Sequence, residues 1–221
     1  MLLSLISQSR PSGATRAGPR FAARVAKAAA MVAAVILAGC ATRATVVLHP
    51  VAVSVPGAKE VSLLVVTTRA PTGIDDGVLF GGERGRGLSL LEIGVSIPPN
   101  HKTGEVEWPE SLPPDPSRHF ATTRVRNVDR QQAPAAFRAR LAATGRKHVL
   151  VFVHGFNNRF EDAVYRFTQI VHDSEAAVTP VLFTWPSRGK AVAYVYDRES
   201  ANFSRDALES VLQALAREPG V

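Results

Sequence analysis

The stretch V149-L150-V151-F152-V153-H154-G155-F156-N157-N158 decides the fold, because an uninterrupted apolar run of strand length ends at a His-Gly pair and then turns polar. A helix is expected directly after it, ending at about His172, with apolar residues at helical spacing on one face. Asn157 and Asn158 are expected to cap its first turn, where acidic residues also suit the helix dipole. The pattern predicts a buried strand followed by a helix that packs against the sheet.

The same order of strand and helix is repeated toward the C-terminus. Residues 180–185 form a second apolar run, and most of residues 197–217 have the spacing of an amphipathic helix. Residues 131–144 suit a helix that precedes the first strand. Apolar strands joined by helices are typical of parallel strands covered on both faces. We therefore expect an α/β fold with a mainly parallel sheet, flanking helices and its chemistry at the carboxyl ends of the strands.

The chain upstream of this unit is expected to add strands at the amino end of the domain. Residues 60–68 and 88–97 have strand character, and a further short strand is expected near residues 120–128. Residues 73–87 are interpreted as a glycine-rich loop and residues 100–117 as irregular surface chain. The folded domain is thus predicted to span residues 60–221.

The distribution of charge argues against a nucleic-acid partner. Of 26 basic and 19 acidic residues, five basic and no acidic residues lie in positions 1–40, which leaves 21 basic and 19 acidic residues and a net charge of only +2 over positions 41–221. Neutralising several phosphates requires a clustered excess of positive charge, which this part of the chain lacks.

The order of residues 1–40 predicts a secretory signal peptide, with a basic region followed by a short apolar core and small residues. The core ends at L37-A38-G39-C40, which resembles a bacterial lipoprotein signal. We therefore expect lipidation (palmitate-type acylation) of Cys40, a tether over residues 41–59, and attachment to the membrane of the bacterial cell envelope, facing the periplasm or the outside. The alternative is an incidental cysteine at the edge of an uncleaved membrane anchor. Cys40 is the only cysteine, so no internal disulfide can form.

The His-Gly pair suggests half of an acyl-transfer site. A sharp turn after a strand exposes backbone amides that can stabilise a developing oxyanion, and the start of a helix adds positive potential. The backbone amides of Phe156 and Asn157 are therefore candidate oxyanion donors, with His154 and Gly155 supporting the turn. In the alternative interpretation, His154 is a strand-end side chain bonded to the backbone and Gly155 only makes the turn.

Several motifs together resemble an α/β-hydrolase family whose members are esterase- or lipase-like proteins of unknown function. They are the V151-F152-V153-H154-G155-F156-N157-N158 run, L182-F183-T184-W185-P186-S187 and D197-R198-E199-S200-A201, with T67-T68-R69, F80-G81-G82-E83-R84, G94-V95-S96-I97-P98 and H101-K102-T103-G104-E105 upstream. The resemblance covers about residues 60–217. It implies ester or acyl hydrolysis by a serine on a G-x-S-x-G-like elbow, followed by an acid and a histidine.

The chain contains no good match to that elbow. In the nearest, W185-P186-S187-R188-G189, a tryptophan replaces the first glycine and a proline precedes the serine. Ser187 is interpreted as a turn or capping residue, and His172, Asp173 and Asp197 as poor substitutes for the missing base and acid. We therefore expect an amino-terminal portion of a hydrolase, incomplete at its C-terminal end and inactive. The alternative is a non-catalytic, lipid-anchored binding or structural protein of the cell envelope.

No cofactor and no metal are expected. The six histidines show no i, i+4 pair and no H-E-x-x-H motif, and the single cysteine is assigned to lipid. Residues 80–87 are rich in glycine but lack the lysine of a phosphate-binding loop. The only small-molecule partner expected is an ester or acyl substrate, for a completed site.

Overall fold

The computed structural model describes residues 48–73, 77–145 and 148–219, which all fall in one compact unit, Ala44–Val221. The predicted signal peptide, Cys40 and the first part of the tether lie outside the described residues. Within the described ranges, no helix has the length and apolarity that crossing a membrane requires.

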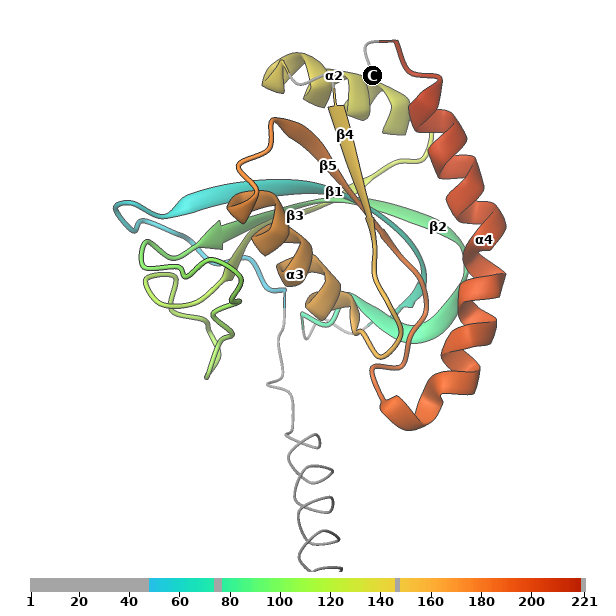
Figure 1. Cartoon of the computed structure of the whole chain (residues 1–221), viewed down its shortest axis with the longest axis horizontal. Helices are drawn as coiled ribbons and strands as arrows, with labels where there is room; N and C mark the ends of the chain where they lie inside the picture. The colour runs from blue at the N-terminus through green and yellow to red at the C-terminus, as the bar shows by residue number, and fades with distance from the viewer. Residues whose placement is uncertain (1–47, 74–76, 146–147, 220–221) are drawn as a thin grey trace, which may run out of the picture. The chain divides into compact units, whose positions relative to one another are not determined.

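Five strands form one sheet with helices on both faces (Figure 1). The strands have the order β3-β2-β1-β5-β4. The elements along the chain are β1 (Lys59–Pro71), β2 (Phe80–Ile97), β3 (Ala121–Val128), α2 (Ala133–Thr144), β4 (His148–Val153), α3 (Phe160–Asp173), β5 (Val178–Thr184), the 3-10 turn η1 (Ala191–Ala193) and α4 (Tyr194–Ala216). Every strand and helix predicted from the sequence is therefore present.

The sheet is mixed, so the prediction of a mainly parallel sheet was wrong. β1 pairs with β5 and β5 with β4 in parallel, whereas β1 pairs with β2 and β2 with β3 antiparallel. The chain between β1 and β2 is too short for the crossover that a parallel pair requires. β2 also begins at Phe80, so residues 80–87 are strand and not the glycine-rich loop that was expected.

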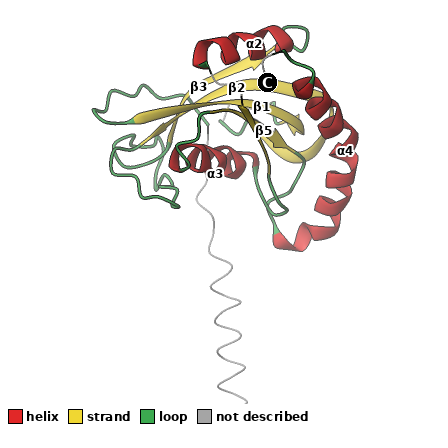
Figure 2. Ribbon diagram, turned by 45° about the horizontal axis from the view of Figure 1, so that its top comes forward, coloured by secondary structure: helices red, strands yellow, loops and turns green. Residues whose placement is uncertain are grey.

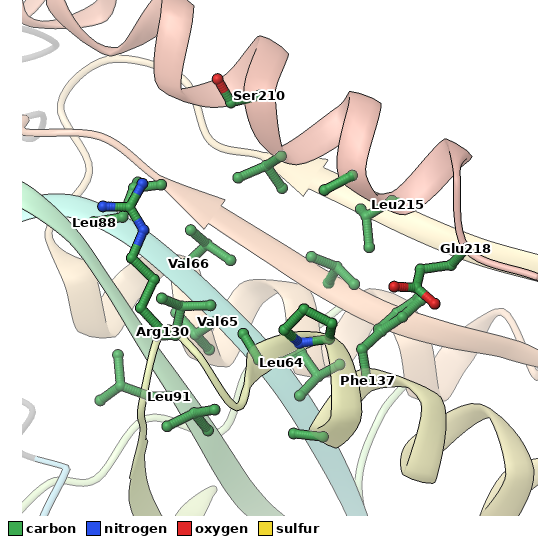
Figure 3. A pocket seen from close by; sticks show the side chains of 18 residues that line it. Leu64, Val65, Val66, Leu88, Leu91, Arg130, Phe137, Ser210, Leu215 and Glu218 are labelled. Carbon is green, nitrogen blue, oxygen red and sulfur yellow. The ribbon is translucent and has the colours of Figure 1, made fainter.

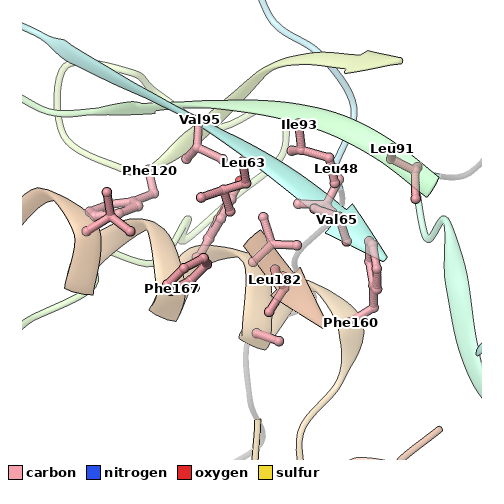
Figure 4. Close-up of a cluster of buried hydrophobic side chains, with 14 of the residues drawn as sticks. Leu48, Leu63, Val65, Leu91, Ile93, Val95, Phe120, Phe160, Phe167 and Leu182 are labelled. Atoms are coloured by element: carbon pink, nitrogen blue, oxygen red, sulfur yellow. The ribbon is translucent and has the colours of Figure 1, made fainter. Parts of the chain in front are cut away.

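Alternation along β1 explains the layers, because successive side chains of a strand point to opposite faces. Leu63 and Val65 join the core under α3, which also includes Phe160 and Phe167 of that helix (Figure 4). Val66, on the opposite face, packs in a cluster with side chains of α4, and a third cluster joins the same face to α2. Figure 2 accordingly shows α3 and α2 on opposite sides of the sheet.

Leu48 shows that the folded unit begins before residue 60. This side chain is fully buried in the core under α3, and its backbone N–H donates to the carbonyl of Gly77. The described end of the predicted tether is therefore packed against the domain.

β4 and β5 are equally apolar but occupy different positions in the sheet. β5 lies between β1 and β4, and its Val181, Leu182 and Phe183 are at most 2 % exposed. β4 lies at the edge of the sheet, most of its side chains are only half-buried, and Val153 is 40 % exposed. The stretch that predicted the fold is therefore an edge strand, whereas the sequence predicted a fully buried one.

Candidate functional site

The carboxyl ends of β4 and β5 meet at one edge of the sheet, as their parallel pairing requires. Val153, the last residue of β4, pairs with Phe183 of β5. His154 and Trp185 therefore lie next to each other, and their rings stack with centroids 4.8 Å apart and planes inclined by 18°. The indole Nε1 of Trp185 also donates to the carbonyl of His154 at 2.9 Å.

His154 is a neutral, buried residue that joins two loops. Its side chain is inaccessible, and burial, followed by the charge of Arg69, lowers the pKa of His154 to about 4. The neutral ring with its proton on Nδ1 donates to the carbonyl of Gly155 at 2.7 Å and accepts at Nε2 from the amide of Trp185 at 3.1 Å. Both ring nitrogens are thus occupied, so His154 supports the turn and is not placed to act as a base.

Arg69, near the end of β1, ties the surrounding loops together. Its side chain is 1 % exposed. Nη1 donates to the carbonyls of Gly81 and Ser187 at 3.1 and 2.9 Å, and Nη2 donates to the carbonyl of Asn158 at 2.8 Å. Nη2 also lies 3.3 Å from Nε2 of His154. Burial lowers the pKa of Arg69 to about 10, so the guanidinium remains charged at neutral pH beneath the loop that follows β4.

Asp197, in the first turn of α4, binds the same loops from the other side. Its fully buried carboxylate accepts the amide of Asn157 at 2.9 Å, the hydroxyl of Ser187 at 2.5 Å and the amide of Arg188 at 3.0 Å. Asp197 therefore anchors two loops to α4. Because the amide of Asn157 already has this acceptor, it is not available to an oxyanion in this conformation.

The amide of Phe156 remains as the candidate oxyanion donor. It donates to no residue in the described part of the chain, whereas the amide of the next residue is engaged by Asp197. Gly155 was expected to make the turn, but it does not have a positive φ; that conformation falls on Asn157, with φ of 59°. A Cβ at Gly155 would meet no atom within 4 Å. The backbone at Gly155 is therefore not crowded by other parts of the described chain.

The start of α3 differs from the expected asparagine cap. Arg159 is the N-cap residue, and its amide donates to the carboxylate of Asp162 at 3.0 Å. The side-chain amide of Asn158 instead donates to the carbonyl of Phe156 at 2.8 Å. The cap is thus supplied from inside the helix, which leaves Asn158 to hold the preceding turn.

Glu161, in the first turn of α3, is a buried acid that the sequence reasoning placed only as a dipole partner. It is 3 % exposed, and burial raises its pKa to about 7. Its Oε1 and the Nε of Arg69 are both buried without a hydrogen-bond partner among the described residues. Arg69 follows an apolar run, but no pattern in the sequence marks Arg69 or Glu161 as buried.

Ser187 is not arranged as a nucleophile. It is 1 % exposed, its hydroxyl donates to Asp197, and its oxygen accepts the amide of Asn158 at 3.0 Å. A serine nucleophile needs a base within hydrogen-bond distance and an exposed oxygen. The geometry agrees with the interpretation of Ser187 as a turn residue. His172 and Asp173 lie at the C-terminal end of α3, away from this site.

A separate apolar cavity of about 260 Å³ lies between the sheet and the helices α2 and α4 (Figure 3). Its walls include Leu64 and Val66 of β1, Phe137 of α2 and Leu215 of α4. None of its lining residues contacts His154 or Arg69 through a hydrogen bond. This cavity therefore offers apolar volume without the polar groups of the strand ends.

Comparisons with known proteins agree with the resemblance seen in the motifs. The family model described as an alpha/beta hydrolase of unknown function (DUF900) matches residues 129–221. Neither the curated proteins nor the solved structures include a match to the chain. The matched segment runs from just before α2 to the end of the chain and contains both strand ends that form the site. Residues 129–221 are thus similar to the alpha/beta hydrolases of unknown function.

Proposed function

We propose that the carboxyl edge of β4 and β5 is the oxyanion-binding half of a serine acyl-hydrolase site. The observation that carries this proposal is that the Phe156 amide donates to none of the described residues, while a Cβ at the preceding Gly155 would meet no atom within 4 Å. The buried guanidinium of Arg69 adds positive charge below the same loop. Preorganised amides of this kind stabilise developing negative charge because they need not reorient during the reaction.

Buried contacts on three sides keep this half-site rigid. Arg69 binds the carbonyl of Asn158, Asp197 binds the amide of Asn157, and His154 binds the carbonyl of Gly155. The amide of Phe156, between these contacts, donates to none of the described residues. A donor held in this way loses little conformational entropy when an acyl oxygen binds.

Amide chemical shifts test the half-site directly. Butyrate, a carboxylate with the shape of an acyl product, should shift the backbone amide resonance of Phe156 in a ¹⁵N-labelled full-length chain and leave that of Asn157 nearly unchanged. Gly155→Val, which fills the open space, should abolish the shift. A resonance of Phe156 that does not respond, or one that responds equally in Gly155→Val, would contradict the proposal.

The 221-residue chain is proposed to lack esterase activity, because no serine and base of the described residues stand beside its oxyanion donor in a catalytic arrangement. Ser187 is buried against Asp197, and both ring nitrogens of His154 are occupied. The full-length chain should not cleave short p-nitrophenyl esters above the buffer rate and should show no acyl burst. A rate that Ser187→Ala abolishes would overturn this proposal.

Attachment to the cell envelope through a lipid on Cys40 is part of the proposal and is supported by the L37-A38-G39-C40 pattern. The chain expressed in bacteria should take up labelled palmitate and partition into detergent. Cys40→Ala should remain unlabelled. Equal labelling of the two chains would refute lipidation at this residue.

The second candidate function is non-catalytic binding of a small apolar ligand, and the cavity between the sheet, α2 and α4 is the observation that favours it. Its volume of about 260 Å³ lies just below the usual range of roughly 300–1,000 Å³ for ligand pockets. An environment-sensitive apolar dye should bind to the parent chain with 1:1 stoichiometry. It should not bind to Leu215→Trp, in which the larger side chain fills the cavity. Binding that is unchanged in Leu215→Trp would exclude the cavity.

A further inference from the structure

Two histidines and two acids that are far apart in the sequence come together at the C-terminal end of α3. His101 and Glu107 lie on the loop after β2, and His172 and Asp173 end the helix. The potential ligand atoms of His101, His172 and Asp173 all lie within 4.8 Å of one another. The spacing rules that predicted no metal site did not detect this group because its members come from different segments.

Two atoms of this group, in His101 and Asp173, are already almost as far apart as two ligands of one metal ion would be. Nε2 of His101 lies 2.8 Å from Oδ1 of Asp173. Two ligands of a tetrahedral zinc ion at about 2.0–2.1 Å are separated by roughly 3.3 Å. The His101–Asp173 pair needs to open by only about half an ångström, and the third ligand needs to approach.

Both of these side chains are oriented by contacts on their other atoms. Nδ1 of His101 lies 2.7 Å from Oε2 of Glu107. Oδ2 of Asp173 accepts the amide of Gly104 and the side-chain amide of Gln169, both at 2.6 Å, which leaves Oδ1 to face His101. A carboxylate behind a histidine and hydrogen bonds behind a carboxylate are the outer contacts that orient metal ligands in proteins.

His172 is the side chain that can move to complete the group. It is partly exposed, and its ring contacts that of His101 edge to face with centroids 5.3 Å apart. It makes no side-chain hydrogen bond to a described residue. Its rotation toward His101 and Asp173 therefore breaks no polar contact.

We propose that His101 Nε2, His172 and Asp173 Oδ1 bind a divalent transition-metal ion, with Glu107 as the carboxylate behind His101. Two imidazoles and one carboxylate suit zinc, cobalt or nickel, whereas magnesium and calcium prefer all-oxygen ligands. Three protein ligands leave a fourth position for solvent. The site links the loop after β2 to the end of α3, so bound metal should stabilise the folded chain.

Calorimetric titration of the full-length chain with ZnCl₂ or MgCl₂ tests the proposal. We expect one zinc site, a rise of the melting temperature with zinc but not with magnesium, and at least a tenfold loss of zinc affinity in His172→Ala. The side chain of His172 makes no hydrogen bond to the described part of the chain, so this variant should melt like the parent chain without metal. His148→Ala, at an exposed position at the start of β4, is the matched control and should keep the parent affinity.

Cobalt spectra separate this site from binding at Cys40. A cobalt complex at the proposed site should show d–d bands of a nitrogen and oxygen environment without a thiolate charge-transfer band, in both the parent chain and Cys40→Ala. Glu107→Gln should weaken binding by roughly 10–100-fold. No saturable zinc binding, or binding that His172→Ala leaves unchanged, would overturn the proposal.

Discussion

The two ends of α3 each lie beside a histidine held by several partners, but the pKa values of the two histidines are shifted in opposite directions. His154, before the N-terminus of the helix, is neutral because burial and the charge of Arg69 lower its pKa to about 4. His101, at the C-terminal end, has carboxylates on both ring nitrogens, and these bonds raise its pKa although burial opposes them. The same residue type therefore has a lowered pKa at one end of α3 and a raised pKa at the other, according to its burial and its partners.

The difference follows from what each end must hold. Beside His154, Arg69 and Asp197 already supply opposite charges in a buried space, and a second cation would be repelled by the guanidinium. Beside His101, the carboxylates of Glu107 and Asp173 contact the two ring nitrogens, and a protonated ring can donate a hydrogen bond to each of them. Position along the helix thus does not determine the direction of the pKa shift; burial and the neighbouring charges do.

The largest effect on stability is expected from removing the hydrogen bonds of Arg69 near the N-terminal end of α3. Arg69→Met leaves three backbone carbonyls and a buried carboxylate without their donor or counter-charge, and should lower the free energy of unfolding by at least about 3 kcal/mol in urea denaturation. Arg69→Lys should recover only part of this, because an ammonium cannot span the same acceptors. The control is Arg126→Met, an exposed partner of Glu92, for which about 1 kcal/mol or less is expected. Equal losses would refute the role of Arg69.

The next effect concerns the pH dependence of stability at the same end of α3. Glu161 has a pKa of about 7 in the folded chain, against an ordinary value of 4.5, so the folded state binds the proton more tightly than the unfolded state does. The free energy of unfolding should therefore fall by up to about 3 kcal/mol as pH rises from about 4.5 to 7. His154 acts in the opposite direction, since its lowered pKa makes stability fall as pH drops from 6.5 to about 4. Over the shared range the two contributions largely cancel.

Glu161→Gln should remove one of these slopes. The variant should be more stable than the parent at pH 8 and nearly equal at pH 4.5, and its stability should rise between pH 4.5 and 6.5, where the parent changes little. Urea denaturation at several pH values measures this. Parallel pH profiles for the two chains would show that Glu161 is not protonated in the folded state.

A smaller effect is expected at the C-terminal end of α3. The raised pKa of His101 means that its contribution to stability is complete below the unfolded value of 6.5 and is lost as pH rises through the folded value. His101→Gln should therefore cost about 1 kcal/mol at pH 6, discounted for partial solvent contact, and less at pH 9. Metal-free buffer with chelator is required. His148→Gln is the matched control. A loss of stability in His101→Gln that does not change with pH would contradict the raised pKa of His101.

The smallest effect is expected at Gly155. It has no positive φ and its Cβ would meet no atom, so Gly155→Ala should change the free energy of unfolding by no more than about 0.5 kcal/mol. Gly82→Ala should lower the free energy of unfolding by more, because a Cβ there would lie 2.9 Å from the Cα of Arg188. A large loss of stability in Gly155→Ala would show that the turn, and not the space for a ligand, requires this glycine.

Local patterns predicted the elements of the fold well, because strands and helices depend on periodicity that the sequence contains. The run at residues 149–153 and the spacing of α3 identified β4 and its following helix. Strand direction and position were not predictable in this way: β1 and β2 are antiparallel because their connection is short, and β4 lies at an edge although it is as apolar as β5. Strand position depends on pairing partners that periodicity does not encode.

The candidate site was predicted only in part. The turn after β4 and the Phe156 amide follow from the His-Gly pair, but the engagement of Asn157 by Asp197 depends on a contact across 40 residues. The buried state of Arg69 and Glu161 has the same origin, since each is charged and neither lies in a pattern that marks burial. Contacts between distant segments, and not residue types, decide which amide is available.

The edge position of β4 also determines where an added strand would lie relative to the proposed oxyanion half-site. Among the described strands, β4 has β5 on one side and no strand on the other. A strand that paired in parallel along this free side would lie about 4.8 Å away and end level with His154, so the residues after it would emerge beside the Phe156 amide. Pairing of such a strand with β4 would therefore extend the sheet and add residues to the half-site at the same time. The register of the strand pair would determine where those residues lie.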